Sequence, residues 1–254
     1  MDPSRLLRAS GMHATIDEDA FTSGAYILSI GGAQQSHVNL AHPESVFYEY
    51  LRRIANVVDL VAPEAEPVRA LHLGAGALTL ARYIAVTRPG SIQHAVEHER
   101  ELLDFVLRHL PLPAGTDLTN HIGDARETLA KFDGGAFDVV VLDVFAGPDS
   151  APHLTEPAFY REAAALLSER GVLLVNVGDE PPLAFTRNQI RALDQVMNDV
   201  GALAEEAMFS GRYPGNVVLV GLNRPWPADW TERLLDAGPH PAGVRTGPDL
   251  DPLR

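Results

Sequence analysis

The sequence predicts an α/β protein built around a doubly wound, mostly parallel sheet. From residue 68 to residue 200, short apolar segments typical of strands alternate with amphipathic segments typical of helices, which places helices on both faces of a parallel sheet. Residues 137–143 (FDVVVLD) and 171–177 (GVLLVNV) are almost continuously apolar, as strands covered on both faces are. A short turn, GRYPG, joins the last two predicted strands, residues 203–209 and 216–222, so the last strand is expected to be antiparallel.

A small β-hairpin is expected near the N-terminus. Residues 1–20 are expected to be loosely ordered. Two apolar runs, residues 25–30 and 38–40, then flank the turn signal Gly31-Gly32. Two such runs around paired glycines predict a hairpin.

A helix is predicted after the hairpin, over residues 42–61 (HPESVFYEYLRRIANVVDLV), because apolar residues recur there at helical spacing and Pro43 suits a first turn. The stretch 62–68, rich in Pro and Glu, is a linker. Further strands are predicted at residues 68–73, 92–97 and 117–122, and further helices at residues 156–169 and 183–200. The chain is thus divided into an N-terminal hairpin and helix region (residues 1–60), an α/β domain (61–224) and a peripheral, partly disordered tail (225–254).

Composition limits the classes of partner and site. The formal net charge is -14 and the pI is about 5.0, so nucleic acid and anionic membrane are not expected as partners. The absence of cysteine excludes disulfides, thiolate metal sites and a cysteine nucleophile. The first residues lack the apolar centre of a signal peptide and no apolar run is long enough to span a bilayer, so a cytoplasmic protein is expected.

Candidate ligand-binding residues follow the predicted strands, because open α/β sheets bind ligands at the carboxyl ends of their strands. Gly74 and Gly76 end the first strand and open a helix, where backbone amides approach a ligand closely; the alternative is a plain tight turn. Glu97 ends the next strand and is expected to accept hydrogen bonds from ribose hydroxyls; the alternative is a charge in the first turn of the following helix.

Two more strand ends extend this series. Gly123 and Asp124 follow the third strand, where the carboxylate of Asp124 is expected to meet the amino group of adenine; the alternative is that it caps the next helix. Asp143 closes an apolar strand and is expected to face the cleft, since a buried carboxylate needs a partner; the alternative is an exposed residue that bonds to loop amides. His153 lies in a loop expected beside the cleft.

Together these residues indicate an adenosine ligand with a charged tail. A dinucleotide-binding fold would more often keep a third glycine, where this chain has Thr79. The sequence contains no P-loop motif and no cluster with convincing metal-ligand spacing, so no metal is expected.

The segment from about Gly32 to Leu222 resembles spermidine synthases and, more broadly, class I S-adenosylmethionine-dependent methyltransferases. The resemblance rests on G-x-x-Q-S at residues 32–36, on LHLGAGALTL, HAVEHE and IGDARETL, and on FDVVVLDVFAGPDSAPHLTEPAFY. It implies a seven-stranded, Rossmann-like methyltransferase-type sheet with an antiparallel last strand. It also implies that Gln35 contacts the nucleoside and that the chain forms a homodimer.

Several positions depart from the family's pattern. The resemblance aligns Ala77 with the Asp that holds the ammonium group of decarboxylated S-adenosylmethionine, and Ala146 with the Asp that deprotonates the attacking amine. The acceptor motif D-E-x-x-Y-[HQ]-E becomes residues 43–49, which retain Glu44 and Glu49. The remaining candidates are Asp179 as a third acceptor-side carboxylate, and Tyr48, Asp149 and His153 as groups that steer or deprotonate the acceptor.

Three functions are compatible with these residues. The first is transfer of an alkyl group, most simply methyl, from S-adenosylmethionine to a small-molecule acceptor, since methyl transfer can proceed by proximity and orientation with little acid–base help. The second is aminopropyl transfer from decarboxylated S-adenosylmethionine to a diamine, with methylthioadenosine as the nucleoside product. The third is a non-catalytic nucleoside-binding or partner protein.

Overall fold

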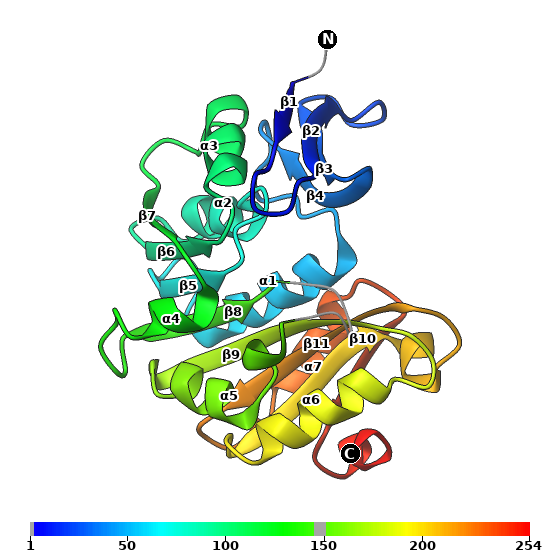
Figure 1. Ribbon diagram of the computed structural model, residues 1–254. Coiled ribbons are helices and arrows are strands. Elements are labelled where there is room, and N and C mark those ends of the chain that lie inside the picture. Colours follow the sequence, from blue (N-terminus) through cyan, green and yellow to red (C-terminus); the bar gives the residue numbers. More distant parts are fainter. Residues whose placement is uncertain (1–2, 145–150) are drawn as a thin grey trace.

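A computed structural model describes residues 3–144 and 151–254 of the chain and confirms the predicted α/β class (Figure 1). Its central sheet has the order β12-β10-β11-β9-β8-β5-β6-β7. The strands are β5 (Arg69–Leu73), β6 (Ile92–Glu97), β7 (Asp117–Ile122), β8 (Phe137–Leu142), β9 (Leu167–Asp179), β10 (Asp199–Glu205), β11 (Gly215–Leu222) and β12 (Ala242–Thr246). Strands β5 to β9 pair in parallel, and β11 lies antiparallel between β9 and β10.

Helices cover both faces of the central sheet, as the nearly continuous burial of strands such as β8 requires. The helices are α1 (Glu49–Val61), α2 (Thr79–Thr87), α3 (Arg100–His109), α4 (Ala125–Leu129), α5 (Pro157–Ala164), α6 (Ala184–Asp194) and α7 (Trp230–Ala237). Along β8, Val140 and Leu142 join a core with α5 and α6, whereas Val139 and Val141 join a core with α1, α2 and α7. Strand residues alternate between faces with a period of two, so one apolar strand supplies both cores, and α5 and α6 lie on the opposite side from α1 and α7 (Figure 1).

The N-terminal segment forms a four-stranded antiparallel sheet, larger than the predicted hairpin. Its strands are β1 (Ser4–Leu6), β2 (His13–Glu18), β3 (Ala25–Ile30) and β4 (Ala33–Asn39). The expectation that residues 1–20 are loosely ordered is wrong for residues 3–18, because Ala14 and Ile16 of β2 are buried. They pack with Leu28 of β3 against Leu102 and Phe105 of α3.

Helix α1 begins at Glu49, later than the predicted start near Pro43. The Asn39 side chain accepts hydrogen bonds from the amides of Ala41 and His42, which makes a turn in place of helix. Tyr48 keeps extended dihedral angles (φ -72°, ψ 127°) at the N-terminus of α1. The predicted helix of residues 156–169 likewise ends early, because β9 starts at Leu167 and pairs with β8; β10 begins at Asp199 instead of residue 203.

Residues after Arg224 do not form the expected disordered tail. They supply α7, then β12, which pairs antiparallel with β10 and extends the predicted seven-stranded sheet to eight strands, and a final 3-10 helix over Gly247–Leu253. Leu250 and Leu253 of that last helix are buried in the core with α6. Burial of these side chains explains why the C-terminal segment is ordered. The proposed division into domains at residues 60 and 224 stays a prediction.

Candidate functional site

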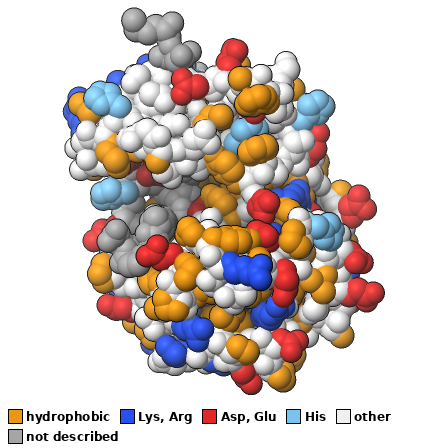
Figure 2. Space-filling model, turned by 90° about the vertical axis from the view of Figure 1, so that its right-hand side faces the viewer, with side chains coloured by type: hydrophobic (Ala, Val, Ile, Leu, Met, Phe, Trp, Pro, Cys, Tyr) orange, Lys and Arg blue, Asp and Glu red, His pale blue; other side chains and the backbone are white. Residues whose placement is uncertain are grey.

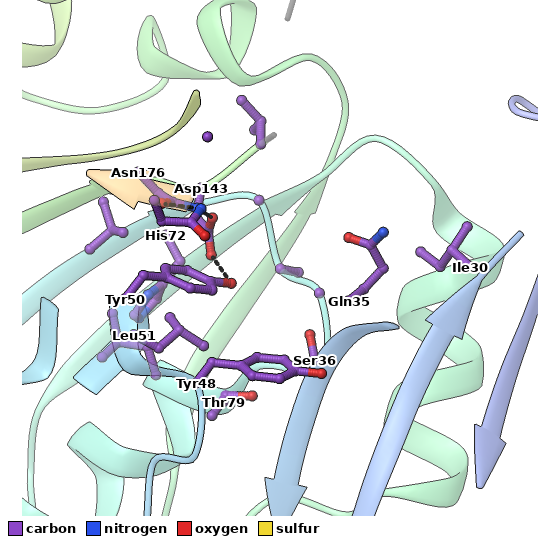
Figure 3. A pocket seen from close by; sticks show the side chains of 18 of the residues that line it. Ile30, Gln35, Ser36, Tyr48, Tyr50, Leu51, His72, Thr79, Asp143 and Asn176 are labelled. Atoms are coloured by element: carbon purple, nitrogen blue, oxygen red, sulfur yellow. Dashed lines mark hydrogen bonds between the residues drawn. The ribbon is translucent and has the colours of Figure 1, made fainter. Parts of the chain in front are cut away.

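A cleft of about 1520 Å³ lies between the N-terminal sheet and the carboxyl ends of the central strands. Met12, Ile30 and Gln35 line it from the N-terminal side, and Gly74 and Asp143 line it from the central sheet. Figure 3 shows the side chains of Tyr50 and Asp143 directed toward each other, with Gln35 on the strand that faces them. The cleft therefore occupies the edge at which the sequence placed its strand-end candidates.

The glycine loop after β5 is as closely packed as a ligand-binding turn requires. Gly74 has φ +97°, and a Cβ there would lie 2.3 Å from the carbonyl oxygen of Asp143. Gly76 has φ +49°, and its Cβ would lie 2.8 Å from Ser36 Oγ. Ser36 Oγ also accepts a hydrogen bond from the amide of Ala77. Only glycine fits these two positions without displacement of neighbouring atoms.

Ala77 contributes its backbone and not its side chain to this region. The methyl group is buried in the core beneath the N-terminal sheet, with 1% of the residue exposed. Among the described residues, Ala77 is not part of the cleft lining, whereas its neighbours Gly76 and Leu78 are. The loop thus presents no charged side chain at this point.

Glu97 joins the glycine loop to the end of β6. Its Oε2 accepts a hydrogen bond from the amide of Ala75 (3.2 Å), and its Oε1 accepts one from the amide of Glu99 (2.9 Å). Both of the roles considered for Glu97 are therefore compatible with its position, since it bonds to the turn before α3 and also lines the cleft. A carboxylate has about four acceptor sites, so capacity remains for ligand hydroxyls.

Asp124 caps the N-terminus of α4, and its side chain is hydrogen-bonded to His153. Asp124 Oδ1 accepts hydrogen bonds from the amides of Arg126 (2.8 Å) and Glu127 (3.1 Å). Its Oδ2 lies 2.7 Å from His153 Nε2. Burial works to raise the pKa of Asp124, but the hydrogen bonds from His153 and the two amides outweigh it and hold the pKa below its usual value. Asp124, His153 and Gly123 all line the cleft.

Asp143 is the acceptor at the centre of a hydrogen-bonded chain. Its Oδ1 accepts from Asn176 Nδ2 (2.8 Å), and its Oδ2 accepts from the hydroxyl of Tyr50 (3.3 Å) (Figure 3). Asn176 Oδ1 accepts in turn from Asn216 Nδ2 (3.0 Å). Burial raises the pKa of Asp143, and the bonds from Asn176 and Tyr50 work in the opposite direction. Asp143 is among the residues that line the cleft.

Aromatic side chains form the wall next to Asp143. The rings of Tyr48 and Tyr50 lie nearly parallel, with centroids 6.3 Å apart and an interplanar angle of 15°. The Tyr48 hydroxyl donates to Gln34 Oε1 (3.4 Å) and not to Asp143. Burial raises the pKa of both phenols, so each keeps its proton at neutral pH. Gln35 is exposed on the facing strand β4 and lines the cleft.

Two acidic residues, Glu49 and Glu205, line the cleft near Tyr213. Glu49 forms an ion pair with the buried Arg53 (3.0 Å). Glu205 lies beside Tyr213 and raises the pKa of its phenol, with Glu49 contributing in the same direction. All four side chains line the cleft.

Sequence reasoning missed Tyr50, Asn176, Glu205 and Tyr213. Asn176 had a signal, because it is the polar residue in the apolar run GVLLVNV. Tyr50 follows the acceptor-like motif directly but matches no position in it. Nothing in the sequence connects Glu205 with Tyr213.

Two predicted acceptor-side residues do not line the cleft that the described residues form. Glu44 is exposed and bonds to His42 (3.1 Å). Asp179 accepts hydrogen bonds from the amides of Thr186 (2.7 Å) and Glu180 (2.8 Å) and so fixes the start of α6. Ala146 and Asp149 lie outside the described residues.

On the face shown in Figure 2, Asp and Glu side chains are scattered and do not gather in one patch. Within residues 3–144 and 151–254, no group of three or more His, Asp or Glu side chains has the arrangement of a metal site. In the same part of the chain, no helix has both the length and the apolar character needed to cross a bilayer.

The chain is similar to polyamine-synthesising enzymes in sequence and in fold. It is 27% identical over 143 residues to the polyamine aminopropyltransferase of Neisseria meningitidis, which covers 56% of this chain and 53% of the relative. A probable spermidine synthase from Corynebacterium glutamicum superposes with a TM-score of 0.85 at 27% identity, covering 96% of this chain and 90% of that one.

A human methyltransferase-like protein 13 in complex with SAH shares the fold more distantly, with a TM-score of 0.57 at 20% identity over 74% of this chain and 86% of that one. No family model matches the sequence. The chain spans about half the length of the curated relatives it matches.

Proposed function

Because the chain is a spermidine synthase-like protein with the class I methyltransferase fold, we propose that its cleft binds an S-adenosylmethionine-type nucleoside and transfers an alkyl group to an amine. One observation carries the proposal. The glycine loop, the carboxylate of Glu97 and the buried carboxylate of Asp143 line one cleft at the carboxyl ends of adjacent strands. Nucleosides bind at such ends in open α/β sheets.

The proposed pose follows from the chemistry of each strand end. The tail of the nucleoside lies over Gly74 and Gly76, which line the cleft with their backbone alone. Glu97 accepts hydrogen bonds from the ribose hydroxyls, and Asp124 lies at the amino edge of the adenine. Gln35, exposed on β4, closes over the nucleoside from the N-terminal sheet.

In the proposed reaction, the nitrogen lone pair of a neutral amine attacks the carbon next to the sulfonium. The C–N bond forms as the C–S bond breaks, and the bond electrons leave on sulfur as a neutral thioether. A proton must leave the nitrogen, and we assign its acceptance to Asp143. A general base contributes about 10²–10⁴-fold, and one with a raised pKa is better matched to neutral pH. Holding the two reactants in line supplies much of the remainder.

There are two candidates for the transferred group, aminopropyl and methyl. The name of the relatives, polyamine aminopropyltransferase, and the carboxylates of Glu49 and Glu205 in the cleft lining favour an aminopropyl group and a cationic acceptor. The buried methyl of Ala77 favours methyl transfer, because the glycine loop then offers no carboxylate to hold the ammonium of a decarboxylated donor. Methyl transfer is therefore the second candidate.

Calorimetric titration with S-adenosylmethionine, its decarboxylated form and methylthioadenosine tests the proposal. We expect binding of at least one, and preference for the decarboxylated donor supports aminopropyl transfer to putrescine. Glu97→Gln removes charge-assisted bonds of about 1.5 kcal/mol or more, so affinity should fall about tenfold. Glu127→Gln is the control, because Glu127 is exposed and does not line the cleft that the described residues form. No binding of any of the three ligands would refute the proposal and favour a non-catalytic partner protein.

A further inference from the structure

His153 and Asp124 form a fixed pair on the wall of the cleft. The two side chains meet at 2.7 Å, and they are 45% and 27% exposed, respectively. His153 belongs to a short 3-10 turn, Pro152–Leu154, whose carbonyl at His153 accepts a hydrogen bond from Arg126 Nη1 (3.2 Å). Arg126 of α4 also forms an ion pair with Glu162 of α5 (2.6 Å). Its side chain therefore links the turn to both helices.

The hydrogen bonds already present determine which atoms can meet a ligand. Asp124 Oδ1 accepts from two backbone amides and is saturated. Asp124 Oδ2 accepts only from His153 among the described residues and keeps a further lone pair. Because a carboxylate with a lowered pKa cannot donate, His153 Nε2 must carry the hydrogen of this bond.

The tautomer fixes the chemistry of the other ring nitrogen. With the hydrogen on Nε2, the neutral imidazole has a bare Nδ1 that can only accept. The nearby backbone donors, the amides of Arg126 and Glu127, are both used by Asp124 Oδ1. The pair thus offers a ligand two acceptors, Asp124 Oδ2 and His153 Nδ1.

We propose that His153 is a specificity-determining residue that reads, together with Asp124, the amino edge of the bound nucleobase. An exocyclic amino group has two hydrogens and matches two acceptors. A base with a carbonyl at that position places a third acceptor against them, which leaves all three acceptors without a hydrogen-bond donor at the contact. This inference rests on the proposed nucleoside site and assigns to His153 a role in base selection, in place of the acceptor-side role expected from the sequence.

The test compares methylthioadenosine with methylthioinosine, which differ in the amino and carbonyl groups. Calorimetric titration at pH 8, above the usual titration range of imidazole, should show that the wild type prefers methylthioadenosine by about 100-fold. His153→Ala should lower that ratio about tenfold, the effect of one hydrogen bond. His153→Gln should restore part of the ratio, because its amide can donate to Asp124 and present an oxygen to the base.

His42→Ala is the matched control, because His42 is also paired with a carboxylate, Glu44 (3.1 Å), but does not line the cleft among the described residues. Its ratio should equal that of the wild type. If His153→Ala weakens both nucleosides equally and leaves the ratio unchanged, His153 has only a structural role and the inference is wrong. Wild-type binding without preference also overturns the inference alone, whereas no wild-type binding of either nucleoside overturns the proposed function with it.

Discussion

Tyr50→Phe removes the hydroxyl that lies 3.3 Å from Asp143 Oδ2 and leaves the aromatic ring in place beside Tyr48. Asp143 keeps its shorter bond from Asn176 (2.8 Å). The substitution therefore removes one hydrogen-bond donor to Asp143 Oδ2. The pKa of Asp143 should report that loss directly.

The expected effect follows from the strength and direction of the lost bond. A hydrogen bond to an ionised group contributes about 1.5–3 kcal/mol, and a long one belongs at the lower limit. About 1.5 kcal/mol corresponds to a change of about one in pKa. Burial already raises the pKa of Asp143, and the Tyr50 bond works against burial, so Tyr50→Phe should raise the pKa of Asp143 by about one more.

The pH dependence of stability follows from the raised pKa of Asp143. A carboxyl whose pKa is raised in the folded state keeps its proton where the unfolded chain has lost it, so stability falls as pH rises from the unfolded to the folded value. Tyr50→Phe extends this interval upward. Its loss of stability should be largest at high pH and should disappear when Asp143 is protonated in both proteins.

Carbon-13 NMR of aspartate-labelled protein measures the pKa of Asp143, with Asp143→Asn used to assign the resonance. Tyr48→Phe is the control, since the Tyr48 hydroxyl donates to Gln34. If Tyr50→Phe leaves the titration unchanged, or if Tyr48→Phe moves it as far, the reasoning about the hydrogen-bonded chain fails. If Asp143 is the base, the acidic limb of the rate profile should move upward with the NMR value.

Three further predictions concern the glycine loop, the C-terminal segment and self-association. Gly74→Ala should cost about 3 kcal/mol or more of unfolding free energy in thermal or urea melts, because the new Cβ would lie 2.3 Å from the Asp143 carbonyl oxygen; a melt like that of the wild type contradicts this. Leu250→Ala should cost about 2–5 kcal/mol, since Leu250 is 0% exposed, whereas Leu235→Ala, at 37% exposure, should change stability by under about 0.5 kcal/mol; equal effects would refute the ordered C-terminal packing. Sedimentation velocity should show a homodimer that Phe21→Glu weakens about tenfold or more, because Phe21 is a large apolar side chain that is 97% exposed; a monomeric wild type would refute it.

The strand ends could be predicted from the sequence because local patterns determine them. Gly74, Glu97, Asp124 and Asp143 all follow apolar strand segments, and parallel strands end at the same edge of a sheet. The sequence pattern did not reveal which residues form hydrogen bonds with these strand-end side chains. Tyr50 reaches Asp143 from a helix 93 positions away in sequence, and only tertiary packing sets that contact.

Other side chains and segments have contacts that a local pattern does not reveal. Asp179 was expected as an acceptor-side carboxylate, and its Oδ2 accepts a hydrogen bond from the amide of Thr186 at the start of α6. Residues after Arg224 looked disordered because Pro, Gly and Asp are frequent there. Their order depends on a few apolar side chains, such as Leu250, and on pairing of β12 with β10, which a local pattern does not reveal.

Strand β12 also bears on aggregation of the protein at high concentration. Without it, β10 would present an open ladder of unpaired amides, the usual template for aggregation through sheet edges. With it, the outer strand is five residues long and lies between Pro241 and Pro248, whose nitrogens carry no hydrogen to donate. A C-terminal segment that resembles a dispensable tail therefore covers the edge of β10, and truncations made for crystallisation should stop short of it.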